Sequence, residues 1–206
     1  MRATAGLVNI LRLAAVFIAA AWISPGAAQT FTPASRVEAP GVGNLYRVAP
    51  NLYRGAQPTK EGFAHLSGKL GIKTVINLRH EHDDKAQAAG LPLQLQRVRF
   101  QTWHIGDDGG AKIVRALRLL REAEARGPVF VHCKHGSDRT GAIIALYRIL
   151  YQGQDKESAI SEMMQENFGF HKVWATAPGW ANIPAYIRKA DVEDLRRRVA
   201  AGSGGN

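Results

Sequence analysis

The segment PVFVHCKHGSDRTG, residues 128–141, decides the fold of this chain. Its first half is a short apolar run typical of a buried strand, and the residues that follow it, AIIALYRILY, form an apolar helical pattern. A loop between the end of a strand and the start of a helix directs several backbone N–H groups into one concavity, to which the helix adds the positive end of its dipole. The segment therefore predicts an anion-binding loop between a strand and a helix.

Three residues of this loop suit phosphate chemistry. Gly136 allows the backbone to turn and to approach a ligand with no side chain in the way. Arg139 carries a planar, two-pronged donor that matches two phosphate oxygens. Cys133 lies in the same positive field, which favours the thiolate, the nucleophilic form of cysteine. We therefore expect a phosphate-binding loop with a nucleophile at its base.

The Cys-x5-Arg spacing, with His before the cysteine and Thr-Gly after the arginine, resembles the motif of the protein tyrosine phosphatase superfamily. The chain resembles the dual-specificity branch of that superfamily. Residues 52–58 (LYRGAQP) and 70–79 (LGIKTVINLR) look like the opening of an atypical group found in bacteria, plants and fungi. Residues 168–171 (FGFH), followed by Trp174, look like the later part of exported bacterial members. The resemblance covers about residues 45–195.

This resemblance implies a role for each loop residue. Cys133 would attack phosphorus and form a phosphocysteine, while Arg139 would clamp the equatorial oxygens. Thr140 would donate its hydroxyl to the cysteine sulfur. His132 would orient the loop by hydrogen bonding, the alternative being a core histidine with no catalytic role. The expected substrate-binding residues are Lys134, His135, Gly136, Ser137, Asp138 and Arg139.

The leaving oxygen needs a proton, which the family supplies from an aspartate on a separate upstream loop. Asp107 and Asp108 lie 26 and 25 residues before the cysteine (133 − 107 and 133 − 108), and two glycines follow them, as suits a mobile loop. An acidic cap on the next helix is an equal alternative. His104 and Asp138 are further candidates, although the charge of Asp138 inside the loop would oppose phosphate binding.

The overall charge favours anionic partners. The 206 residues include 27 Lys and Arg against 17 Asp and Glu, a formal net charge of +10. Lys134 and His135 add positive charge at the rim of the site. In relatives with a basic residue after the cysteine, such charge accompanies phosphoinositide or inositol polyphosphate substrates, the alternative being a solvated surface pair. No aromatic–basic interleaving indicates nucleic acid binding.

No cofactor, metal or disulfide is expected. The histidines are scattered, and the single cysteine, Cys133, excludes an intramolecular disulfide. Backbone amides and Arg139 would take the place of a metal in binding the phosphate.

The N-terminal residues 1–28 have the pattern of a secretory signal peptide. They contain no Asp or Glu, they carry Arg2 and Arg12, and small residues precede a cut after Ala28. The apolar run over 13–23 is shorter than the about 20 residues that span a bilayer. We expect export to the periplasm, with no stable membrane insertion once the leader is cut; an uncleaved anchor is the alternative.

The mature chain predicts a single α/β domain. Residues 29–42 are expected to form a tether, 43–201 a dual-specificity phosphatase-like domain and 202–206 a flexible tail. Because strands alternate with helices, we expect a four- to five-stranded, mostly parallel sheet flanked by helices, with the active loop at the C-terminal end of a strand. The expected strands are 45–48, 52–54, 74–78, 93–100 and 129–132, and the expected helices are 58–70, 81–89, 111–126, 141–151, 156–167 and 184–200.

The sequence thus predicts an exported, metal-independent, monomeric phosphatase that hydrolyses phosphate monoesters, phosphotyrosine and phosphoserine or phosphothreonine among them. A phosphoinositide or inositol polyphosphate phosphatase is the alternative with the same chemistry. A binding module for phosphorylated ligands is disfavoured by the intact Cys133 and Arg139. A rhodanese-like sulfurtransferase is disfavoured by the five-residue spacing and by Thr140 after the arginine.

Overall fold

A computed structural model describes residues 32–102, 105–178 and 182–202. The expected leader, residues 1–28, and His104 lie outside these ranges. Within them, no helix has both the length and the apolar character needed to cross a membrane.

A six-stranded mixed sheet forms the centre of the molecule, in the order β1-β2-β3-β6-β4-β5. The pairs β3–β6, β6–β4 and β4–β5 are parallel, whereas β1–β2 and β2–β3 are antiparallel. The central strand β6 is buried along its whole length, which explains its continuous apolar run. The strands are β1 (Ser35–Arg36), β2 (Tyr46–Ala49), β3 (Leu52–Gly55), β4 (Thr74–Asn77), β5 (Gln94–Arg97) and β6 (Val129–His132).

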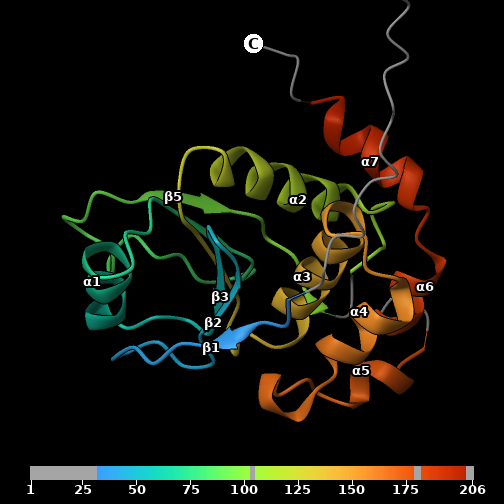
Figure 1. The fold of residues 1–206 in the computed structure, drawn as a ribbon, viewed down its shortest axis with the longest axis horizontal. Coiled ribbons are helices and arrows are strands. Elements are labelled where there is room, and N and C mark those ends of the chain that lie inside the picture. Colours follow the sequence, from blue (N-terminus) through green and yellow to red (C-terminus); the bar gives the residue numbers. More distant parts are fainter. Residues whose placement is uncertain (1–31, 103–104, 179–181, 203–206) are drawn as a thin grey trace, which may run out of the picture.

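Helices cover both faces of this sheet, with α1 on one side and α2 and α3 on the other (Figure 1). Alternate residues of β6 supply the two cores: Phe130 packs with Phe63 of α1, while Val129 and Val131 join the cluster that contains α2 and α3. The helices are α1 (Lys60–Gly68), α2 (Ala111–Glu124), α3 (Asp138–Tyr151), α4 (Lys156–Met163), the 3-10 turn η2 (Glu166–Phe168), α5 (Val173–Thr176), α6 (Ile183–Lys189) and α7 (Val192–Ala200). The α/β class and the mostly parallel sheet are as predicted.

The expected helix over residues 81–89 is wrong, because this segment folds as a series of turns. Its aspartates form other hydrogen bonds that compete with a helix. Asp83 accepts a hydrogen bond from the backbone N–H of Lys85, and the buried Asp84 points inward to Gln57 and His132.

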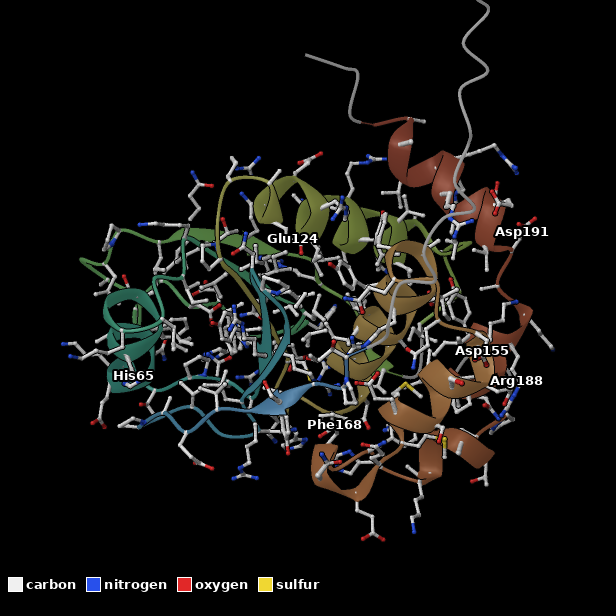
Figure 2. The ribbon with its side chains drawn as sticks, in the orientation of Figure 1. His65, Glu124, Asp155, Phe168, Arg188 and Asp191 are labelled. Carbon is white, nitrogen blue, oxygen red and sulfur yellow. The ribbon has the colours of Figure 1, made fainter. Side chains whose placement is uncertain are left out.

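The expected single helix over residues 184–200 is two helices, α6 and α7 (Figure 2, where Asp191 is labelled between them). Asp191 ends the continuity because its side chain accepts a hydrogen bond from the backbone N–H of Asp194, which makes it the N-cap of α7. The expected helix over 156–167 likewise divides into α4 and η2.

The second half of the expected tether, residues 29–42, belongs to the fold. β1 pairs with β2, and the buried Val42 joins the core beneath α1. Backbone hydrogen bonds from Val37 to Leu45 and from Thr59 to Gly41 hold this segment in place. The domain therefore begins before residue 43, and β1 raises the number of strands above the expected four to five.

Candidate active site

The predicted loop follows β6 at the C-terminal edge of the sheet and leads directly into α3, which begins at Asp138. Gly136 has φ = +74°, a left-handed conformation. A Cβ atom at this position would lie 2.5 Å from the carbonyl carbon and oxygen of Gly55. Both the backbone conformation and this close approach to β3 therefore require glycine.

A buried arginine from β3 holds the loop from below. The Nη2 of Arg54 donates a hydrogen bond to the carbonyl oxygen of Gly136 at 2.6 Å. The Arg54 guanidinium lies 4.3 Å from the ring centre of Phe168, which is labelled in Figure 2, and its side chain is 1% exposed. Burial lowers the pKa of Arg54 to about 10, so the side chain remains a cation at neutral pH.

Two further contacts hold the loop from the side. Asn44 donates from its side-chain amide to the carbonyl oxygens of His135 and Phe168, at 2.9 and 3.0 Å. Asp138 accepts hydrogen bonds from the backbone N–H of His171 at 3.0 Å and pairs with its Nδ1 at 2.8 Å. Both carboxylate oxygens of Asp138 are thus used in anchoring, which shows how an acidic residue fits in this loop and disfavours it as a proton donor.

His132 lies between the loop and the segment that follows β4. Its Nδ1 is 3.2 Å from the carbonyl oxygen of Cys133, and its Nε2 is 3.0 Å from the Oδ2 of Asp84. The Oδ1 of Asp84 accepts a hydrogen bond from Gln57 at 2.8 Å. Burial raises the pKa of Asp84, but the hydrogen bonds from His132 and Gln57 outweigh it, so the pKa lies below that of an ordinary aspartate.

A cavity of about 380 Å³ opens beside the loop. Arg139 lines it, with its Nη1 donating to the carbonyl oxygen of Phe100 at 3.3 Å. Its Nε is buried without a hydrogen-bond partner in the described part of the chain, an unsatisfied donor on a side chain that lines the cavity. The cavity is lined by Arg79, His80, Glu81, Gln101, Thr102, Lys134 and Arg139.

The other expected site residues differ in exposure, and of them Lys134 lines this cavity. Cys133 is a free, buried thiol, 3% exposed. Lys134 and His135 are exposed, but His135 lines a neighbouring pocket with Ser137 and His171. Ser137 is buried, and its hydroxyl donates to the carbonyl oxygen of His135 at 3.4 Å. Burial, together with the charges of His171 and Lys134, lowers the pKa of His135.

The expected hydrogen bond from Thr140 to the cysteine sulfur is not formed. The Thr140 hydroxyl is buried at the start of α3, and no partner for it occurs among the described residues. Such a buried group costs about 1–3 kcal/mol until it is satisfied. Thr140 and the Nε of Arg139 are therefore two unsatisfied donors in the first turn of α3.

The structure separates the two candidate acids. Asp108 is half-buried and acts at the start of α2: its Oδ2 accepts from the backbone N–H of Lys112 at 3.2 Å and lies 3.4 Å from the Lys112 ammonium. Asp107 is exposed. Neither aspartate is among the described residues that line the cavity. The N-cap of α2 is Gly110, so neither aspartate is the expected acidic cap, although Asp108 anchors the first turn through Lys112. The assignment of Asp107 or Asp108 as the acid stays a prediction.

Several residues that shape the site did not emerge from the sequence. Arg54, Gln57 and Arg79 lie at or just beyond the C-terminal ends of β3 and β4, which flank β6. Because the ends of parallel strands meet at one edge of a sheet, their order would have identified these residues. Asp84 and Asn44 lie in turns and carry no comparable signal. Across the ranges described, no group of three His, Cys, Asp or Glu side chains could hold a metal ion.

A nucleophilic cysteine at the base of a strand–loop–helix and an arginine six residues later define the class of cysteine-based phosphatases. Comparison with known proteins agrees. Residues 45–177 match the family described as "DSP-PTPase phosphatase fused to NAD+ Kinase". The chain is 37% identical over 198 residues to the dual specificity protein phosphatase TpbA of Pseudomonas aeruginosa, covering 93% of this chain and 86% of that protein.

Solved structures extend this comparison to the fold. A crystal structure of P. aeruginosa TpbA superposes with a TM-score of 0.68 at 38% identity, covering 81% of this chain and 96% of that one. A TpbA variant in complex with phosphotyrosine superposes with a TM-score of 0.67 at 35% identity, covering 88% of this chain and 100% of that one. The catalytic core of the yeast phosphatase SIW14, at 23% identity, shares the fold with a TM-score of 0.60 over 78% of this chain and 93% of that one. The chain belongs to the dual-specificity branch of the protein tyrosine phosphatase family and is a protein phosphatase.

The lowered pKa of Asp84 predicts a pH-dependent contribution to stability. Because the folded pKa lies below the unfolded value of about 3.9, the ionised carboxylate stabilises the fold above that pH, and the contribution is lost as the pH falls through the folded pKa. We expect Asp84→Asn to lower the free energy of unfolding by about 1–3 kcal/mol at pH 7 and by clearly less at pH 3. Chemical denaturation at the two pH values measures both differences.

The exposed neighbour Asp83 provides the control, since Asp83→Asn is expected to change the free energy of unfolding by about 0.5 kcal/mol or less. The interpretation of Asp84 is contradicted if Asp84→Asn destabilises the protein equally at pH 3 and pH 7.

Proposed function

We propose that this protein hydrolyses phosphotyrosine, and also phosphoserine and phosphothreonine, in phosphorylated proteins. The observation that carries the proposal is the anchored loop, which places the free thiol of Cys133 at its base and Arg139 in the adjoining cavity. The relatives add support: TpbA is named a dual specificity protein phosphatase, and its variant binds phosphotyrosine.

In the proposed mechanism the Cys133 thiolate attacks phosphorus in line, the bond to the ester oxygen breaks, and a phosphocysteine forms. Asp107 gives its proton to the leaving oxygen. A water molecule then attacks the phosphocysteine, Asp107 takes up its proton, and inorganic phosphate leaves with the thiolate restored. Arg139 and the loop amides bind the equatorial oxygens on which the negative charge develops.

We also propose that the protein acts as a monomer after export to the periplasm. The support for export is the leader pattern of residues 1–28.

A second substrate class is favoured by the charge of the cavity. Lys134, Arg79 and Arg139 line it together, and this suits a small, highly anionic phosphate ester such as an inositol phosphate or a phosphoinositide headgroup. Both substrate classes use the same loop and the same phosphocysteine, so that relative turnover distinguishes them.

Release of inorganic phosphate by the purified protein, with EDTA present, tests the activity. The panel contains a phosphotyrosine peptide, a phosphothreonine peptide, a phosphoinositide and an inositol polyphosphate. We expect wild type to act on the phosphotyrosine peptide. Cys133→Ser should lose turnover but keep vanadate binding, whereas Arg139→Lys should lose both because lysine lacks the two-pronged donor.

Turnover by Cys133→Ser would contradict the mechanism. Release from the inositol compounds alone would move the assignment to the second class. Vanadate binding by wild type with no release from any substrate would indicate a binding module instead.

The assignment of the acid predicts different outcomes for two adjacent residues. Asp107→Asn should lower kcat by about 10²- to 10⁴-fold and flatten the alkaline limb of its pH profile, since this residue would supply the proton. Asp108→Asn should keep the alkaline limb and lower the free energy of unfolding by about 0.5–2 kcal/mol, since the Asp108 carboxylate accepts a hydrogen bond from the first turn of α2 and pairs with Lys112. Steady-state kinetics over pH and denaturant unfolding measure the two effects. If Asp108→Asn flattens the alkaline limb and Asp107→Asn does not, the assignment is reversed.

A further inference from the structure

The ends of two parallel strands bring two further cations, besides Arg139, to the active-site cavity. In the register of β4 and β6, Asn77 lies opposite His132. Two residues beyond each of these positions are Arg79 and Lys134, and both side chains line the cavity that Arg139 also lines. The sheet therefore places these cations beside the phosphate-binding loop.

Arg79 is held in this position by its neighbours. Its Nη1 donates to the side-chain oxygen of Gln57 at 3.0 Å, and its backbone N–H donates to the side-chain oxygen of Asn77 at 2.7 Å. Gln57 is itself fixed, because its backbone N–H donates to the carbonyl oxygen of Lys134 at 3.2 Å. Of the guanidinium nitrogens of Arg79, Nη1 carries a hydrogen bond within the described ranges, so the Nε and Nη2 donors remain for a ligand.

The cations of this cavity form no direct ion pair within the described part of the chain, although the charge of Asp84 acts on Arg79 and opposes the lowering of its pKa. No carboxylate there lies within ion-pair distance of Arg79, Lys134 or Arg139. The acidic residue in the described lining, Glu81, is exposed and lies 3.8 Å from the ring of His80. Burial, together with the charge of Arg139, lowers the pKa of Arg79, as expected for cations that repel one another.

A single phosphate does not account for this arrangement. In the proposed mechanism Arg139 and the loop amides bind one phosphoryl group, whereas the cavity of about 380 Å³ lies in the size range of sites for whole small ligands. The free edge of the Arg79 guanidinium suits the two oxygens of a carboxylate or phosphate, and Lys134 adds a mobile point charge.

We propose that Arg79 and Lys134 form a second anion-binding subsite that selects substrates with another anionic group close to the scissile phosphate. This inference rests on the proposed function, since it concerns the substrate of the same site. The second group is a carboxylate or a phosphate, supplied by an acidic residue next to the phosphorylated one or by a second phosphate of a small ester.

Pairs of substrates that differ by this one group test the subsite. One pair is a phosphotyrosine peptide with Asp or Asn beside the phosphotyrosine; the other is a cyclic polyol with two adjacent phosphates or one. The measured quantity is the selectivity ratio, kcat/KM for the doubly anionic member over that for the singly anionic member. The pair whose ratio exceeds one in wild type identifies the source of the second anion.

We expect Arg79→Gln to lower this ratio about 10-fold, the loss of one charge-assisted hydrogen-bonded contact, so that the doubly anionic member loses more kcat/KM than the singly anionic one. Arg79→Lys should restore part of the ratio because it keeps the charge without the two-pronged donor. Lys134→Gln should lower the ratio independently. Arg115→Gln is the control, since it removes the same charge from an exposed position on α2.

Three results would overturn the subsite: a ratio unchanged by Arg79→Gln in both pairs, an equal loss for both members of each pair, or an equal fall in Arg115→Gln. The same ratios are measured as binding affinities in the Cys133→Ser background. If the proposed hydrolysis fails but the binding ratio still depends on Arg79, the function is wrong and the subsite stands. If hydrolysis occurs but neither ratio depends on Arg79, the proposed function stands and the subsite is wrong.

Discussion

The contact between the active-site loop and the backbone at the end of β3 is the constraint on which the rest of the site depends. At Gly136 the chain has a left-handed conformation and approaches Gly55 so closely that a single methyl group would overlap its carbonyl. From the same strand, the buried Arg54 donates to the Gly136 carbonyl oxygen at 2.6 Å. This hydrogen bond ties the Gly136 carbonyl to a buried cation of β3.

The rest of the fold completes this constraint from several directions. Asp138 ties the first turn of α3 to His171, Asn44 ties His135 to Phe168, and Asp84 supports His132 behind the nucleophile. These contacts join residues 33 to 91 positions apart, so the loop geometry is a product of the folded domain. In a site held in this way, the hydrogen-bond donors are in position before the substrate binds. Such preorganised donors stabilise the negative charge that develops in the transition state.

The sequence predicts those parts of the structure whose cause is local. The bounds of β6 are as predicted, because a short continuous apolar run that ends in a glycine-containing loop is typical of a buried strand. The expected helix over 81–89 was wrong because Asp84 forms its hydrogen bonds with Gln57 and His132, far away in the chain. Arg54 and Asp138 were missed as anchors for the same reason, since a charged residue shows its partner only once the strands are paired. Arg79 could have been found from the strand order, which brings the residues after β4 beside those after β6.

The most direct test of this account is the affinity of Gly136→Ala for vanadate, compared with Gly153→Ala. Both glycines have positive φ, but a Cβ at Gly153 would meet no atom within 4 Å, whereas one at Gly136 would overlap β3. We predict that Gly136→Ala, folded by circular dichroism, binds vanadate about 100-fold or more weakly than wild type, because the loop must move off the strand. Gly153→Ala should retain the wild-type affinity. Equal affinities of the two folded variants would contradict the claim that the contact with β3 sets the anion-binding shape of the loop.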